Sequence, residues 1–86
     1  MTIQLMGYEP VDYENKAGKR VQGVKVYGID LTTESDRIIG HPTFEEFISI
    51  PKDTAFDLGE LYAVEFEQYR FKGRYETKVS GLRKEK

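Results

Sequence analysis

Apolar and polar side chains alternate over several short runs, and this two-residue period is typical of half-buried β-strands. In residues 2–8, Ile3 and Leu5 fall on one side of an extended chain, and Gly7 permits a bend or a bulge. Pro10 is expected to interrupt the hydrogen-bonded ladder, because proline has no backbone N–H, before the chain becomes extended again. The first part of the chain therefore predicts an interrupted strand.

Residues 15–18, Asn-Lys-Ala-Gly, are typical of a turn and predict a hairpin between residues 11–13 and residues 21–31. The returning strand is rich in β-branched and aromatic side chains, which favour an extended backbone. Its two glycines, Gly23 and Gly28, are expected to mark bulges in a strongly coiled sheet.

The middle of the chain is less regular. Residues 32–42 are polar and broken, and they predict either a long connection or a ragged strand. Residues 43–48 carry two competing patterns. Thr43 and Glu46 have the spacing of a capping box, and three apolar side chains share a helical face. Residues 47–50, followed by Pro51, also suit a short strand, so the sequence leaves both structures open.

The final hairpin has the most definite register. Residues 56–59 predict a turn before a strand over residues 60–71, and Lys72-Gly73 predicts a two-residue hairpin turn. That turn places an apolar pair and an opposite-charge pair on opposite faces: Phe66 with Val79, and Glu67 with Lys78. Core packing explains the apolar side chains nearest the body of the domain: Tyr62, Val64, Phe66 and Val79. It does not explain Tyr69 and Phe71, which lie beside cations.

These elements predict a small all-β domain, a five-stranded OB-like barrel with at most one short helical turn at residues 43–48. Eighty-six residues without a linker or a repeat suffice for one domain, which we place at residues 1–82. Residues 83–86 are expected to form a mobile basic tail. Because a small open sheet has edges that need pairing, we also expect a homodimer.

Composition excludes several classes of protein. The chain has no cysteine and only one histidine, His41, so zinc bound by sulfur, disulfides and His-dependent hydrolysis lack their residues. The carboxylates within residues 53–57 do not follow a calcium-loop spacing, and no phosphate-binding glycine motif occurs. We therefore expect neither an enzyme nor a metal or other cofactor. No apolar run approaches the ~20 residues of a membrane span, so we expect no membrane partner. The lack of cysteine fits a cytoplasmic protein.

Charge is unevenly distributed along the chain, although the formal net charge is only −2. Residues 30–67 contain ten acidic and two basic side chains, whereas residues 68–86 contain seven basic and two acidic ones. This asymmetry indicates either one end that faces a polyanion or a solvated surface that mixes both signs.

Two segments combine aromatic rings with cations, residues 13–27 and residues 69–75. Single-stranded nucleic acids are bound by this combination, because bases stack on the rings while lysine and arginine follow the phosphates. The net negative charge argues against a protein that wraps a duplex. Stacking-dominated binding tolerates carboxylates, provided that they lie on another face.

The order of short motifs resembles small proteins of phages and mobile elements of Gram-positive bacteria, which are similar to the helix-destabilising proteins of filamentous phages. The resemblance leaves out residues 32–42 and is carried by residues 3–13, 18–27, 46–49, 56–61 and 72–73. It implies a dimeric five-stranded OB-like barrel that binds single-stranded DNA. The residues that it implicates lie near the two hairpins: Tyr8, Tyr13, Lys16, Lys19, Arg20, Tyr27, Tyr69, Arg70, Phe71, Arg74 and Tyr75. The heavily acidic middle departs from the pattern of that family.

Two functions of different classes follow. The first is sequence-tolerant binding of single-stranded DNA in replication or transfer of a phage or mobile element, with replication or transfer proteins as further partners. The alternative is a phage or mobile-element interaction module that docks a partner protein through an acidic face or a strand edge. The two differ in whether the aromatic and cationic hairpins converge in space.

Overall fold

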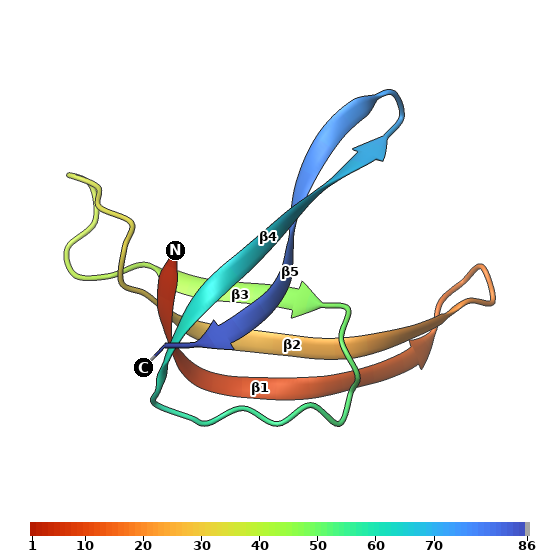
Figure 1. Cartoon of the computed structure of the whole chain (residues 1–86), viewed down its shortest axis with the longest axis horizontal. Helices are drawn as coiled ribbons and strands as arrows, with labels where there is room; N and C mark the ends of the chain where they lie inside the picture. Colours follow the sequence, from red (N-terminus) through yellow and green to blue (C-terminus); the bar gives the residue numbers. More distant parts are fainter. Residues whose placement is uncertain (86) are drawn as a thin grey trace.

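Five antiparallel strands form one sheet in the computed structural model, which describes residues 1–85. The strands are β1 (Thr2–Glu14), β2 (Arg20–Asp30), β3 (Thr43–Ile48), β4 (Leu61–Phe71) and β5 (Arg74–Lys84). Their order in the sheet is β3-β2-β1-β4-β5, and the sheet curls so that β3 and β5 approach each other (Figure 1). The all-β prediction is confirmed.

No ladder joins β3 to β5 within residues 1–85, so the sheet is not closed. We call this gap between the two edge strands the seam. A five-stranded sheet whose edges converge without pairing is compatible with the partly open barrel of an OB-like fold. In Figure 1 the β1–β2 hairpin extends to the right and the β4–β5 hairpin rises toward the upper right, so that their tips lie apart in this view.

The core lies inside the curl of the sheet. Ile3, Leu5, Val24, Val26 and Ile48 are completely buried, and each contributes about 1.5–3 kcal/mol relative to an exposed position. The remaining core residues are Phe44, Tyr62, Val64 and Val79. The core therefore draws on all five strands.

The first strand is continuous where an interruption was expected. Its register shifts between Leu5 and Gly7, which confirms the predicted irregularity, but the ladder to β2 then continues through Pro10 to Glu14. The pairing of β1 with β4 covers only residues 2–4, so β1 has a single neighbour around Pro10. A proline is tolerated where one side of a strand is unpaired.

The two glycines of β2 differ. Gly23 does not mark a bulge, because the register of β2 against β1 is regular there, whereas Gly28 lies opposite the register shift between Leu5 and Gly7, as predicted. Both positions also allow close packing. A Cβ on Gly23 would lie 2.5 Å from the Phe47 ring and within contact of the Ile48 carbonyl. A Cβ on Gly28 would lie 2.7 Å from the Gln4 carbonyl oxygen. Neither site accommodates a side chain without displacement of its neighbours.

Residues 43–48 form a strand, and no helix occurs within residues 1–85. The helical alternative was open because Phe44 and Ile48 are four residues apart, a spacing that puts two side chains on one face in a helix and in a strand alike. Pairing with β2 decides in favour of the strand. In the strand both enter the core, while Phe47 points to the opposite face. Residues 32–42 form a connection and carry no strand.

The final hairpin has the predicted register, with Phe66 opposite Val79 and Glu67 opposite Lys78. Lys72 (φ 52°) and Gly73 (φ 80°) both have positive φ, as a tight two-residue hairpin turn requires. Phe66 was expected in the core but is 48% exposed, and it follows directly after the register shift of β4 against β5 between Glu65 and Phe66.

The carboxyl-terminal strand is longer than expected. β5 includes Arg83 and Lys84, so these residues belong to the sheet instead of a mobile tail. The Glu85 amide donates to the Leu61 carbonyl, and Lys86 lies outside the described residues. The described part of the chain contains no helix with the length and apolar composition of a membrane span.

Candidate nucleic-acid interface

An aromatic surface covers the side of β1, β2 and β3 that points away from the core, which we call the outer face. Strand alternation and the observed register place Tyr13, Lys25, Tyr27 and Phe47 on it. The three rings are 54%, 36% and 37% exposed, respectively. Each ring therefore presents surface to solvent while resting on the sheet.

Phe47 is the residue of this surface that the sequence interpretation missed. Its ring lies over Gly23, which has no side chain to prevent the approach. The signal in the sequence was an aromatic residue in β3 together with a glycine in β2, two residues from Lys25, the partner of Phe47 in the ladder. The helical pattern of residues 43–48 obscured it by grouping Phe47 with the core residues.

Lys25 lies at the centre of the outer face. Its ammonium group is 2.7 Å from Glu45 Oε1 and 5.5 Å from the centroid of the Tyr27 ring. The hydrogen bond to the Glu45 carboxylate raises the pKa of Lys25, and the negative charge of Glu45 adds to the effect. The lysine thus remains charged beside an exposed ring.

The turn of the first hairpin presents two further cations. Asn15 Oδ1 accepts hydrogen bonds of 3.0 Å from the amides of Ala17 and Lys19, and Gly18 supplies the positive φ that closes the turn. Lys16 and Lys19 are exposed beside it. The predicted hairpin turn at residues 15–18 is confirmed.

Arg20 projects from the other face of the same hairpin. Its Nε donates to Asp12 Oδ1 at 2.6 Å, and Lys52 donates to the other oxygen of Asp12. The hydrogen bond from Arg20, followed by the one from Lys52, holds the pKa of Asp12 well below its ordinary value. The contact between Asp12 and Lys52 therefore ties the β3–β4 connection to the first hairpin.

The second hairpin presents its aromatic residues on two opposite faces. The register places Tyr69, Phe71, Arg74 and Lys78 on one face, which we call the hairpin face. The opposite side carries Phe66, Gln68, Arg70, Tyr75 and Thr77. Tyr69 and Phe71 are 39% and 50% exposed, and Tyr75 is 73% exposed.

Cations accompany the rings of the hairpin face. Lys78 Nζ lies 5.3 Å from the centroid of Tyr69, and Lys72 Nζ lies 5.3 Å from that of Phe71. Arg74 is 3.0 Å from Glu76, and Lys78 is 3.0 Å from Glu67. Rings and cations are thus adjacent on this face, although two of the cations already have a carboxylate partner.

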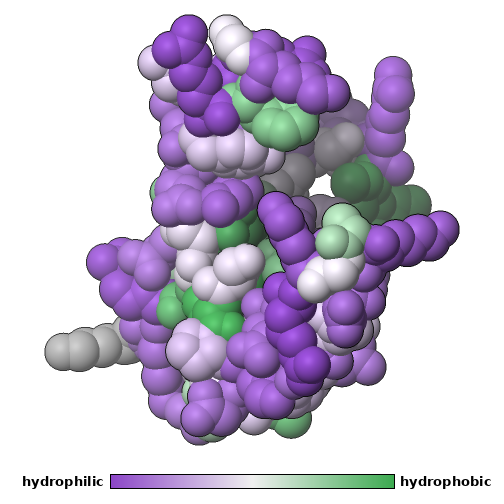
Figure 2. All heavy atoms as spheres, turned by 90° about the vertical axis from the view of Figure 1, so that its right-hand side faces the viewer, coloured by the Kyte–Doolittle hydropathy of each residue, from purple (hydrophilic) through white to green (hydrophobic). Residues whose placement is uncertain are grey.

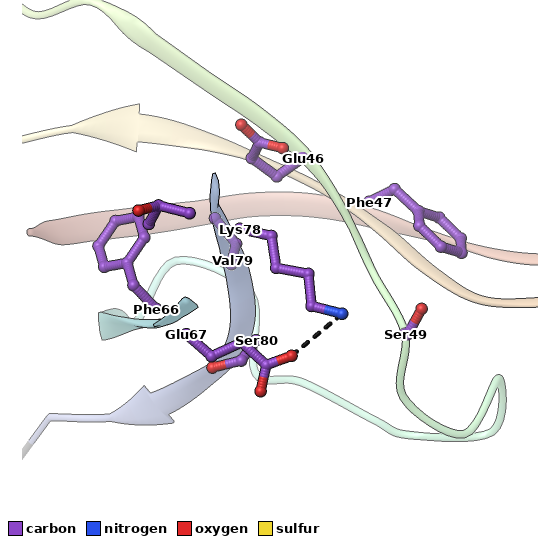
Figure 3. Close-up of a pocket in the computed structure, with 9 residues that line it drawn as sticks. Glu46, Phe47, Ser49, Phe66, Glu67, Lys78, Val79 and Ser80 are labelled. Carbon is purple, nitrogen blue, oxygen red and sulfur yellow. Dashed lines mark ion pairs between the residues drawn. The ribbon is translucent and has the colours of Figure 1, made fainter. Parts of the chain in front are cut away.

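A pocket of about 430 Å³ at the seam joins the two surfaces. Phe47 of the outer face and Lys78 of the hairpin face both line it (Figure 3). Seen from the side to which the hairpins extend, hydrophobic and neutral side chains lie in a recess between hydrophilic ones (Figure 2). We call the five exposed rings of the outer face and the hairpin face the aromatic track: Tyr13, Tyr27, Phe47, Tyr69 and Phe71.

Four residues expected at the interface lie away from this track, and one of them is Arg20, which is bonded to Asp12 on the other face of the first hairpin. Tyr8 faces the interior, where its ring meets Phe56 edge-on with centroids 5.4 Å apart, so it packs against the core instead of offering a stacking surface. Arg70 and Tyr75 project from the side of the second hairpin opposite the hairpin face. Successive side chains of a β-strand point to opposite faces, and this places them on the other side of the hairpin from Tyr69 and Phe71.

The acidic residues of the middle segment are dispersed. Asp30 is buried, and Glu45, Glu67 and Asp57 are each paired with a lysine. The connection of residues 31–42 leaves the sheet at the end opposite the hairpin tips (Figure 1). No group of three or more His, Asp or Glu side chains within residues 1–85 is arranged to hold a metal ion.

Comparison with protein-family models, with curated proteins and with solved structures finds no match to this chain.

Proposed function

We propose that this protein binds single-stranded DNA without strict sequence preference. Bases stack on the aromatic track, while lysine and arginine side chains of the two hairpins neutralise phosphates. The observation that carries the proposal is the shared pocket: Phe47 and Lys78 line it together, and they belong to the two separate ring-and-cation surfaces. One extended single strand of DNA can therefore contact both surfaces.

Stacking accounts for sequence tolerance, because every base has an aromatic face that fits an exposed ring. The OB-like topology supports the same proposal, since folds of this type bind oligonucleotides along the β2–β3 surface and the loops that follow β1 and β4. Here those elements are the outer face and the turns at residues 15–19 and 72–73. Fold analogy adds to the argument from the residues and does not replace it.

A fluorescence titration tests the proposal. Addition of an oligonucleotide of about eight nucleotides, a length within the usual site size of one OB domain, is expected to quench the tyrosine emission as bases cover Tyr13, Tyr27 and Tyr69. Because phosphate neutralisation releases counterions, affinity should fall severalfold between about 50 and 200 mM salt. Emission that does not change at any oligonucleotide concentration would overturn the proposal.

The alternative, docking of a partner protein, is favoured by one observation. β3 is an edge strand that is paired only with β2, and it exposes Glu45 and Glu46. A partner with a basic strand could add to this edge. In that case oligonucleotides would not quench the tyrosine emission, and no salt-dependent affinity would be measured. The same titration therefore separates the two functions.

A further inference from the structure

The pocket at the seam contains groups beyond those that stacking and phosphate binding use. Two phenylalanines, Phe47 and Phe66, contribute apolar surface, and Glu46, Glu67 and Lys78 contribute charge. Hydroxyl groups complete the lining: Ser49, Thr77 and Ser80. A volume of about 430 Å³ lies within the usual range of ~300–1,000 Å³ for small-ligand sites. The pocket is therefore large enough to admit one base of a bound strand.

The charged groups of the pocket leave hydrogen-bond acceptors available. Lys78 Nζ lies 3.0 Å from Glu67 Oε1, so its positive charge is balanced within the pocket wall (Figure 3). Glu46 lies on β3, across the seam from that pair. Within residues 1–85 it forms no ion pair, and its side chain is exposed. A ligand that enters the pocket thus meets a carboxylate with unused lone pairs.

Bases differ in what they present to a carboxylate. Cytosine has an amino group at C4 that donates a hydrogen bond, and Glu is a known acceptor for it. Thymine has a carbonyl oxygen and a methyl group on the same edge, so it offers no donor there. The exposed ring of Phe66 provides an apolar wall against which a base inserted into the pocket packs.

From this arrangement we infer that the seam pocket holds one base of the strand and that Glu46 favours cytosine over thymine in it. This inference rests on the proposed function, because it assumes that a single strand crosses the seam between Phe47 and Lys78. It adds a modest base preference at one position to binding that is otherwise sequence-tolerant.

Affinities for oligo(dC) and oligo(dT) of equal length, measured by fluorescence titration at neutral pH, test the inference. We compare two pyrimidines because their rings have the same size, so stacking differs little between them. One well-placed contact to a base edge predicts about fivefold tighter binding of oligo(dC). The Glu46→Ala variant should bring the ratio of the two affinities close to one.

Glu60→Ala is the matched control, because Glu60 is also an exposed glutamate but lies outside the pocket. Both variants lose one negative charge, which tightens binding of every oligonucleotide alike, so only the ratio of affinities reports on the pocket. The ratio should be unchanged in Glu60→Ala. Equal affinities in the wild type, or a cytosine preference that persists in Glu46→Ala, would overturn the inference and leave the proposed function standing. Failure to bind either oligonucleotide would overturn both.

Discussion

Residues of the same type differ in role according to the face on which they lie. Tyr69 and Tyr75 belong to one hairpin, and both are exposed. Only Tyr69 lies on the hairpin face, where Lys78 approaches its ring. The sequence predicted aromatic residues and cations in this hairpin, and its register also fixed which of them share a face.

Replacing these two tyrosines separately tests that distinction. Since stacking of a base contributes roughly 1–3 kcal/mol, Tyr69→Ala should weaken oligonucleotide binding about fivefold or more. Tyr75→Ala should change the affinity by less than about twofold, because no stacking contact is lost. On the scale at which 1.4 kcal/mol corresponds to a factor of ten, this is a change of less than about 0.4 kcal/mol. Both affinities are measured by titration with a dye-labelled oligonucleotide. Equal losses in the two variants would show that the hairpin face is not the binding face.

Asp30 is a polar residue whose role is structural. It is 6% exposed, and its Oδ1 accepts hydrogen bonds of 2.9 and 3.1 Å from the amides of Thr32 and Thr33. The hydroxyl groups of both threonines also donate to it. These bonds, led by the one from the Thr33 hydroxyl, lower the pKa of Asp30 to about 2. The carboxylate thereby fixes the start of the connection after β2.

The lowered pKa of Asp30 predicts how stability depends on pH. The contribution of the carboxylate is complete above its ordinary pKa of 3.8 and is lost as the pH falls through about 2. Asp30→Asn should lower the free energy of unfolding by about 1–2 kcal/mol at neutral pH, because a charged acceptor is lost. The difference between wild type and variant, measured by urea unfolding, should shrink below about pH 4. A difference that stays constant down to pH 2 would contradict this role.

At the level of elements, local patterns predicted what depends on neighbours in the sequence. The register of the second hairpin was predicted correctly, because the two-residue turn fixes which residues are paired and the alternation of side chains agrees with that pairing. The strand at residues 43–48 was ambiguous, since the spacing of Phe44 and Ile48 fits both a helix and a strand. Pairing with β2 decided it, and that contact lies between distant parts of the chain.

The candidate site was partly predictable for the same reason. Tyr13, Tyr27, Tyr69 and Phe71 follow from aromatic residues beside cations in hairpins. Phe47 and the seam pocket do not, because they depend on how far the sheet curls and on which side of β3 meets β5. Tyr8 was misplaced because the irregularity after Leu5 changes which residues of β1 face inward.

The packing of Phe47 on Gly23 leads to a prediction for the β2–β3 pair. A methyl group at Gly23 would meet both the Phe47 ring and the Ile48 carbonyl, and a backbone atom cannot turn aside. Gly23→Ala should therefore cost about 1–3 kcal/mol of stability, measured by urea unfolding. Gly7→Ala is the control, because nothing lies within 4 Å of a Cβ there, and its φ is not positive. Equal costs at the two glycines would contradict the close packing.

At the scale of the whole molecule, the fold disperses the acidic residues that the sequence concentrates in one segment. The acidic segment of residues 30–67 includes one buried carboxylate and three that are paired with lysines. Part of the rest lies on the connection of residues 31–42, at the end of the sheet away from the hairpin tips (Figure 1). A net charge of −2 is therefore compatible with a cationic, aromatic surface on one side. The homodimer and the replication or transfer proteins stay predictions.

The central claim is that the outer face and the hairpin face bind one strand together across the seam. The most direct measurement is an NMR titration of the ¹⁵N- and ¹³C-labelled protein with a single oligonucleotide of about eight nucleotides. We expect the signals of Tyr27 and Phe47 on the outer face and of Tyr69 on the hairpin face to shift at the same stoichiometry, while those of Tyr8 stay fixed. Shifts confined to one of the two faces, or shifts of the two faces at different stoichiometries, would contradict the claim.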